Sequence, residues 1–208
     1  KDINGLRSEL FIAALALNEA LLESVAKELL IQWDEVSQVI DGRSETFELE
    51  PEYQPIWAML FLFFPVVSTS LSSVQTQFKL MRKREGFGLV MFDEAGQAVN
   101  YHVAGLLQRC RQAMFVGDPI QIEPVVTTPE FIDRDIASDF MPVSMQGDEG
   151  KWGDDYLVSQ LSAQSIADRA SGFYSVIGER RIGIPLLVHR RCVDPMFSVA
   201  NHMAYDGK

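Results

Sequence analysis

Two acidic residues follow directly on an apolar run near the middle of the chain, in Leu89-Val90-Met91-Phe92-Asp93-Glu94-Ala95-Gly96-Gln97. Hydrolysis of a nucleotide needs one carboxylate near a magnesium ion and a second that orients or deprotonates the attacking water. Asp93 suits the first role and Glu94 suits the second. The alternative explanation is an ordinary strand end before a helix, because the first turn of a helix favours acidic side chains.

A second apolar run also ends in a small residue and an acid, in Phe115-Val116-Gly117-Asp118-Pro119-Ile120-Gln121. Gly117 allows the backbone to approach a neighbour closely, and Gln121 is a neutral group that could sense a terminal phosphate by hydrogen bonding. Taken alone, Gly117-Asp118-Pro119 is better explained as an ordinary turn. Two such strand ends joined by one helix, however, fit neighbouring strands of a nucleotide-binding sheet, since ligands bind at the carboxyl edge of parallel strands.

The elements that must position these residues alternate along the chain. Buried strands are predicted at residues 66–70, 88–92, 113–116 and 186–188, and helices at residues 56–64, 74–81, 98–107, 155–170 and 194–203. The strand at 88–92 is a continuous apolar run, which is typical of a strand buried on both faces. This alternation predicts an α/β fold with a parallel sheet flanked by helices.

The first part of the chain is predicted to be helical. A long helix is expected at residues 6–32, where one stripe carries the apolar residues Leu10, Ala14, Leu17, Leu21, Val25 and Leu29. This stripe is expected to be buried. Asp34 would cap a short second helix, and Pro55 would open the next one after an acidic loop at residues 48–54. Residues 127–152 show no clear period and are expected to form a long surface excursion.

Composition limits the classes of function. The net charge is −11 at pH 7, which argues against strong nucleic-acid binding by this chain alone, because phosphate contacts need Lys and Arg. The most apolar run, residues 56–67, is too short to span a bilayer. Cys110 and Cys192 make no disulfide framework and lack paired metal-ligand spacing, so a reduced, cytoplasmic setting is expected. Because the chain begins at Lys1, we expect a fragment of a longer protein.

The two acidic motifs together resemble motifs II and III of superfamily 1 helicases. The closest class is the 5′-to-3′ branch that includes the nonsense-mediated decay helicase and its bacterial relatives. Residues 65–70 look like the segment that contacts the nucleic-acid backbone in such motors, and residues 187–195, with Asn201 and Tyr205 beyond, look like motif IV. The resemblance covers roughly residues 60–125 and 155–208.

This resemblance implies a partial RecA-like sheet of the P-loop NTPase type. The helical N-terminal segment would span residues 1–55, and the first motor domain residues 56–180, including the excursion. The second motor domain would start within residues 181–208. The family's cofactors are ATP and Mg²⁺, and its partner is single-stranded DNA or RNA.

Residue by residue, the resemblance implies that Asp93 holds magnesium and that Glu94 is the catalytic base. Gln121 would couple the terminal phosphate to motion, and Gln97, Gly117 and Asp118 would contact the nucleotide.

Other roles fall on the outer segments. Arg191 would be the arginine finger, with Arg190 as the alternative, because a permanently charged guanidinium matches phosphate oxygens. Ser68, Thr69 and Ser70 would donate to backbone phosphates. The alternative for these hydroxyls is a turn that caps the following helix.

The sequence contains no Gly-x-x-x-x-Gly-Lys-Ser/Thr, the loop that holds the phosphates of a nucleotide. In the resembling family this loop lies upstream of motif II. We therefore expect it to precede Lys1 in a longer protein that couples ATP hydrolysis to translocation on a single strand, and we expect the present chain to be inactive alone.

Two other classes of function stay open. One is a non-catalytic acidic interaction module derived from a helicase, which an intact phosphate loop upstream would argue against. The other is a nuclease or simple NTPase on the same sheet, which measurements of strand separation beside hydrolysis would distinguish.

Overall fold

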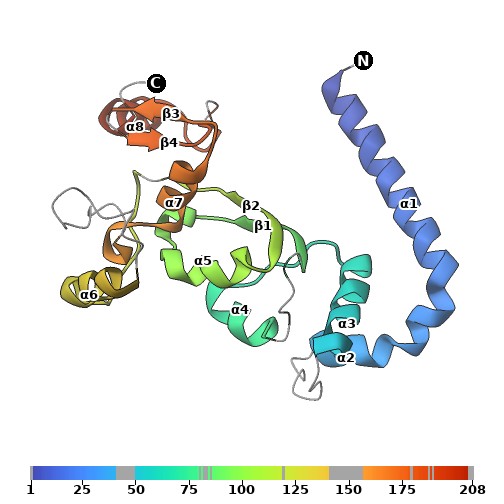
Figure 1. Ribbon diagram of the computed structural model, residues 1–208. Helices are drawn as coiled ribbons and strands as arrows, with labels where there is room; N and C mark the ends of the chain where they lie inside the picture. Colours follow the sequence, from blue (N-terminus) through green and yellow to red (C-terminus); the bar gives the residue numbers. More distant parts are fainter. Residues whose placement is uncertain are drawn as a thin grey trace. The chain divides into compact units, whose positions relative to one another are not determined.

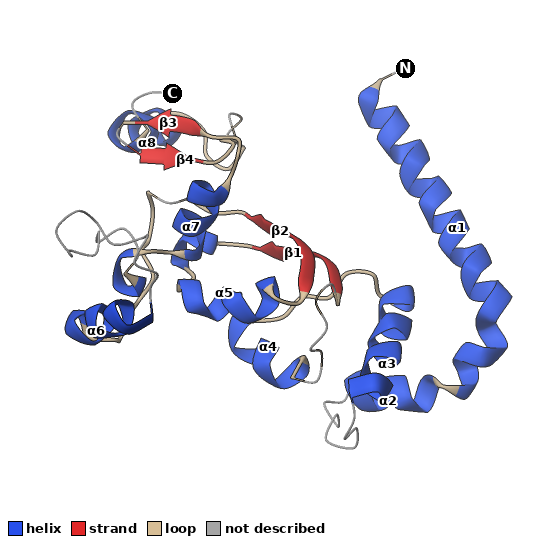
Figure 2. Cartoon of the chain, in the orientation of Figure 1, coloured by secondary structure: helices blue, strands red, loops and turns tan. Residues whose placement is uncertain are grey.

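A computed structural model describes residues 2–40, 50–79, 81, 84, 86–118, 120–140, 157–178, 180–186, 188 and 190–205. The chain divides into two units, Lys1–Gly86 and Phe87–Lys208 (Figure 1). The described part of the first unit is helical, and both sheets lie in the second (Figure 2). The predictions for Pro119, residues 141–152, Leu187 and His189 lie outside the described residues.

The described residues of the first unit form four helices: α1 (Ile3–Ile31), α2 (Trp33–Ile40), α3 (Glu50–Phe63) and α4 (Leu71–Gln77). The ring of Trp57 packs against that of Phe78, with centroids 4.6 Å apart, and against that of Phe61 at 5.5 Å. Trp33 of α2 meets Phe63 of α3 edge to face at 5.2 Å. Aromatic packing of this kind buries a large apolar area and gives the unit its core.

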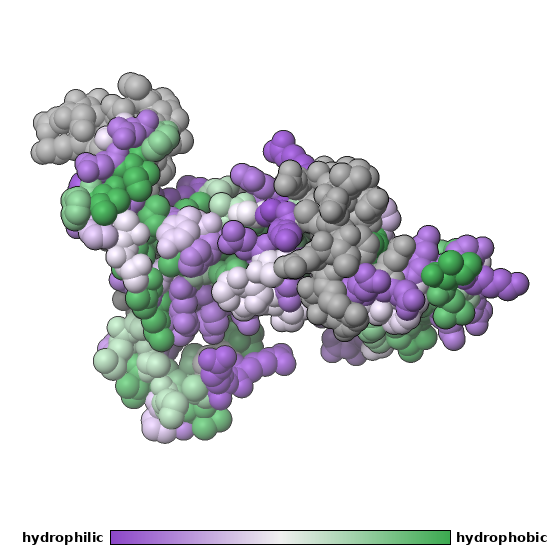
Figure 3. All heavy atoms as spheres, turned by 90° about the horizontal axis from the view of Figure 1, so that it is seen from below, coloured by the Kyte–Doolittle hydropathy of each residue, from purple (hydrophilic) through white to green (hydrophobic). Residues whose placement is uncertain are grey.

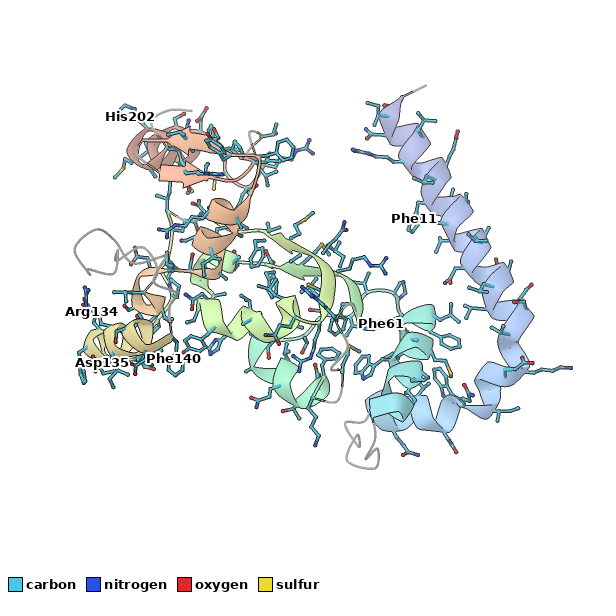
Figure 4. The ribbon with its side chains drawn as sticks, viewed as in Figure 1. Phe11, Phe61, Arg134, Asp135, Phe140 and His202 are labelled. Atoms are coloured by element: carbon cyan, nitrogen blue, oxygen red, sulfur yellow. The ribbon has the colours of Figure 1, made fainter. Side chains whose placement is uncertain are left out.

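Helix α1 forms where the apolar period predicts it, but the prediction that its stripe is buried is wrong. Leu10 is 71% exposed and Leu17 is 73% exposed within the structure. Phe11, which projects outward from the same helix (Figure 4), is also exposed. At the right end of Figure 3, where α1 lies, green apolar side chains stand at the surface beside purple ones. Within the described residues, no helix is both long and apolar enough to cross a membrane.

The local predictions for three segments of the first unit are also wrong. Helix α3 begins at Glu50, so residues 50–54 are helical rather than a loop, and Pro55 lies inside the helix. Pro51 is the proline in the first turn, where its fixed φ suits a helix and its missing N–H costs nothing. Asp34 lies inside α2, which already begins at Trp33. Residues 66–70 form no strand, because none of the described strands pairs with them.

A parallel pair of strands is the centre of the second unit. Strand β1 (Phe87–Phe92) pairs with β2 (Cys110–Phe115), and Phe92 lies opposite Phe115. The connection runs through a 3-10 turn, η2 (Ala95–Gln97), and α5 (Asn100–Leu107). This confirms both strands, their adjacency and the helix between them. The strands are not buried on both faces, since Leu89 and Met91 are 49% and 60% exposed and the described sheet has two strands.

The rest of the second unit departs more from the sequence patterns. Residues 130–140 of the expected excursion form α6 (Glu130–Phe140), on which Figure 4 labels Arg134, Asp135 and Phe140. Its Asp133 is buried and accepts a hydrogen bond from the backbone N–H of Ser159 at 2.7 Å. That bond joins α6 to the short 3-10 turn η5 (Val158–Gln160).

The helix predicted at residues 155–170 begins only at Ala163, as α7 (Ala163–Ala170), because Ser162 caps it by accepting from the Ser165 N–H at 3.1 Å. No strand forms at Leu186 and Val188. A hairpin precedes them instead, with β3 (Ser175–Ile177) antiparallel to β4 (Arg180–Ile182). Helix α8 (Met196–Ala204) agrees with its prediction.

Candidate functional site

The pairing of β1 and β2 continues past the ends of both strands. The Val116 N–H donates to the Phe92 carbonyl at 2.8 Å, and the Ala95 N–H donates to the Val116 carbonyl at 2.9 Å. The rings of Phe92 and Phe115 stack behind them at 4.7 Å. The two strand tips therefore lie side by side, as the sequence predicts.

Two glycines allow the tips to touch backbone to backbone. A Cβ atom on Gly96 would lie 2.7 Å from the carbonyl oxygen of Asp118. A Cβ atom on Gly117 would lie 2.8 Å from the backbone nitrogens of both Ala95 and Gly96. Neither gap leaves room for a methyl group beside backbone that cannot move aside. Glycine at both positions is thus what brings the two motifs into contact.

Asp93 and Glu94 leave the tip of β1 as exposed side chains. Asp93 Oδ1 accepts from the Glu94 N–H at 3.1 Å, and Glu94 Oε2 accepts from Gln97 Nε2 at 3.4 Å. Glu94 has φ +52° and ψ +41°, a left-handed conformation that L-residues other than glycine rarely adopt. This backbone conformation is unfavourable for glutamate, and residues in such conformations cluster at functional sites.

The donor set at this tip fits magnesium. Asp93 Oδ2 has no hydrogen-bond partner in the described part of the chain, so one hard carboxylate oxygen is available. The described residues include no cluster of three or more His, Cys, Asp or Glu able to hold a metal. Magnesium does not need one, because it usually binds through one or two carboxylates, with waters and nucleotide phosphates completing its octahedron.

The loop after β2 is organised around the carboxylate of Asp118. Its Oδ1 accepts from the Ile120 N–H at 3.0 Å, and its Oδ2 accepts from Gln121 Nε2 at 2.7 Å. The hydroxyl of Tyr205, the C-cap residue of α8, also donates to Oδ2. In the structure Asp118 thus holds its own loop, and the Gln121 side chain is turned towards it. The sequence pattern places Tyr205 in the motif but shows no link to Asp118.

The surroundings of Tyr205 raise the pKa of its phenol, first through burial and then through its hydrogen bond to Asp118, while Gln121 opposes the change. The folded chain therefore favours the neutral phenol. Its contribution to stability is complete below the ordinary pKa of about 10 and is lost as pH rises through the raised value.

We expect a tyrosinate absorbance titration of the whole chain, minus that of Tyr205→Phe, to show a group ionising above pH 10 or so. The control is the same titration of Tyr101→Phe. This variant lacks an exposed hydroxyl that makes no hydrogen bond to the described residues. A Tyr205 difference curve centred at or below the ordinary value would contradict the hydrogen bond to Asp118.

Helix α7 packs against both strand tips, which the sequence did not predict. The Ala163 N–H donates to the Ala98 carbonyl at 2.8 Å. Buried Gln164 donates through Nε2 to buried Asp168 at 3.0 Å, and Asp168 also accepts from the Gly183 N–H at 2.9 Å. Gln164 Oε1 would lie 3.3 Å from a Cβ on Gly117. The only sequence signal was the spacing of Gln164 and Asp168, which places them on one helix face.

The remaining predicted residues form no hydrogen bond with this cluster. Arg190 and Arg191 are exposed in the segment before α8, and they make no hydrogen bond or ion pair with the described residues. Ser68, Thr69 and Ser70 belong to the first unit. The Ser70 hydroxyl accepts from the Ser73 N–H at 3.3 Å and caps α4, and the Thr69 hydroxyl donates to Gln77 at 2.5 Å. The structure thus confirms the capping alternative for Ser70.

A comparison with family models finds one match, described as an AAA domain, over residues 46–129. This range contains both strand tips and Gln121. AAA domains are of the P-loop NTPase type, so the match supports nucleotide binding and hydrolysis at that coarse level. At the same coarse level it agrees with the resemblance to superfamily 1 helicases. No curated protein and no solved structure matches the chain.

Proposed function

We propose that this chain provides the magnesium and water side of the ATPase site of a superfamily 1 helicase of the 5′-to-3′ branch. The observation that carries the proposal is the backbone contact between the two strand tips. It puts Asp93 and Glu94 beside the loop of Gly117, Asp118 and Gln121 within one unit. Magnesium supplies charge neutralisation between nucleotide phosphates when bound.

Each residue then has a definite task. Asp93 holds the magnesium ion through its available oxygen, and Glu94 takes the proton of the attacking water. Glu94 suits this role because its carboxylate is exposed directly after the end of β1. Gln121, held by Asp118 through one hydrogen of its Nε2, donates the other hydrogen to a phosphate oxygen and so reports the state of the nucleotide. Arg191, with Arg190 as the alternative, is free to approach the phosphates as the finger.

Contact with a single strand of DNA or RNA falls on the segment before α4. Ser68 is exposed, and its hydroxyl makes no hydrogen bond to the described residues, whereas Thr69 and Ser70 are engaged locally. Ser68 is therefore the strongest candidate among the three to donate to a phosphate. The acidic charge of the chain requires that most phosphate contacts come from other parts of a longer protein.

The test compares two proteins. We expect the 208-residue chain to hydrolyse ATP no faster than a buffer control, because it has no phosphate loop. A longer chain that includes such a loop should hydrolyse ATP with magnesium, and single-stranded nucleic acid should accelerate it. Phosphate release measured with and without a strand checks both points.

Rapid turnover by the 208-residue chain would overturn the division of the site that we propose. Hydrolysis by the longer chain that no strand accelerates would favour a simple NTPase. Absence of hydrolysis in the longer chain would favour the non-catalytic interaction module.

A further inference from the structure

We propose that Tyr205 is a positioning residue that holds the Asp118 carboxylate and, through it, the side chain of Gln121. The structural part of this inference stands on the contacts of the second unit. Only its consequence for nucleotide turnover rests on the proposed function.

The contact is long-range and is made by one hydroxyl. Tyr205 lies 87 residues after Asp118 in the chain and caps the C-terminal end of α8, where its N–H donates to the Asn201 carbonyl. Its ring is half-buried, so the hydroxyl meets Asp118 partly out of water. A hydrogen bond to a charged acceptor in such surroundings is stronger than one between neutral groups.

Asp118 distributes three donors between two oxygens. Oδ1 holds the Ile120 N–H, and Oδ2 holds both Gln121 Nε2 and the Tyr205 hydroxyl. The carboxylate can rotate about the Cα–Cβ and Cβ–Cγ bonds of Asp118. The Ile120 N–H and Gln121 Nε2 belong to the same loop as Asp118, so these two donors can move together with the carboxylate. The tyrosine is the only one of the three donors that belongs to another element. It is therefore the donor that fixes the carboxylate relative to the rest of the unit.

The orientation of Gln121 depends on that carboxylate. Gln121 is exposed and its amide is directed by Asp118, so a rotated carboxylate releases it to other rotamers. A group that must meet a phosphate in one geometry loses efficiency when its rotamers multiply. Tyr205 thus links the loop after β2 to α8. A displacement of α8 would therefore change the orientation of the Gln121 side chain.

The first experiment uses the 208-residue chain and needs no nucleotide. In Tyr205→Phe, which keeps the ring, we expect the side-chain amide signals of Gln121 in an NMR spectrum to shift. Exchange of the Ile120 backbone amide should accelerate roughly threefold to tenfold, the range for one lost hydrogen bond. The thermal midpoint should change little. Tyr101→Phe is the matched control and should alter neither signal.

A second variant separates positioning from packing. In an Asp118→Ala background, Tyr205→Phe should change the Gln121 signals less than it does when Asp118 is present, because only the direct interaction of Gln121 with the Tyr205 hydroxyl is then left to lose. Unchanged Gln121 signals in Tyr205→Phe would overturn the inference. So would a thermal midpoint that falls while shifts spread evenly through the unit, because that pattern describes a packing residue.

The consequence for turnover is measured in the longer chain that carries a phosphate loop. Tyr205→Phe should lower kcat while leaving KM for ATP nearly unchanged, since Gln121 acts after nucleotide is bound. Altered Gln121 signals with unaltered kcat would leave the hydrogen bond standing and remove Gln121 from turnover. Unaltered signals would refute the positioning role whatever the longer chain hydrolyses.

Discussion

Glu94→Gln is expected to lower ATP hydrolysis by about 10²–10⁴-fold in a chain that includes a phosphate loop, and to leave nucleotide binding intact. The carboxamide retains the shape of the side chain and an oxygen that can accept from Gln97. The left-handed backbone at φ +52° is about as unfavourable for glutamine as for glutamate. The substitution therefore removes the proton acceptor and little else.

Two measurements check this prediction together. Phosphate release gives the hydrolysis rate, and the anisotropy of a fluorescent ATP analogue gives the binding constant. Glu19→Gln, an exposed residue of α1, makes the same change of charge far along the chain from the motifs and is the control. Unchanged hydrolysis in Glu94→Gln would remove Glu94 from its role. Loss of analogue binding would mean that the residue holds the nucleotide instead.

Gly117→Ala is expected to destabilise the second unit by about 1–3 kcal/mol, the range for overpacking a site that cannot relax. The new methyl would meet the Ala95 and Gly96 nitrogens at 2.8 Å, and both belong to backbone that is hydrogen-bonded across the tips. The tips can separate only by breaking the bond from the Ala95 N–H to the Val116 carbonyl. Stability and site geometry are therefore lost together.

Denaturant unfolding of the 208-residue chain, followed by circular dichroism, measures the effect. Gly88→Ala is the control, because a Cβ there meets nothing within 4 Å, and it should be neutral or slightly stabilising. Gly96→Ala should behave like Gly117→Ala, since its Cβ would lie 2.7 Å from the Asp118 carbonyl oxygen. Equal stabilities of Gly117→Ala and Gly88→Ala would show that the tips do not touch.

The contact between the two strand tips explains why two short sequence motifs were enough to predict which residues lie together at the site. Each motif is local: an apolar run that forms a strand, then a glycine or an acid that ends it. Adjacent parallel strands with one connecting helix then bring both ends to the same edge of the sheet. The adjacency of Asp93 and Gly117 needed no further information than this, and the pairing of β1 with β2 confirms it.

Predictions that depend on distant partners did less well. Residues 66–70 have strand-forming composition, yet a strand exists only when another strand accepts its hydrogen bonds. The stripe of α1 is apolar, but burial requires a surface to cover it, and Leu10 and Leu17 remain exposed. The helix at residues 130–140 was also missed, and the hydrogen bond from the Ser159 N–H to its buried Asp133 joins residues too far apart in the sequence for a local pattern to show.

Local sequence patterns thus predicted the two strands of the parallel sheet, most helices and the residues at the two tips. Hydrophobic periodicity and turn residues determine structure over a few positions, so the sequence alone shows their effect. The contact of Tyr205 with Asp118, the support of Gly117 by Gln164 and the exposure of α1 required the folded chain. They join residues whose separation carries no pattern, and only packing determines which side chain a given carboxylate meets.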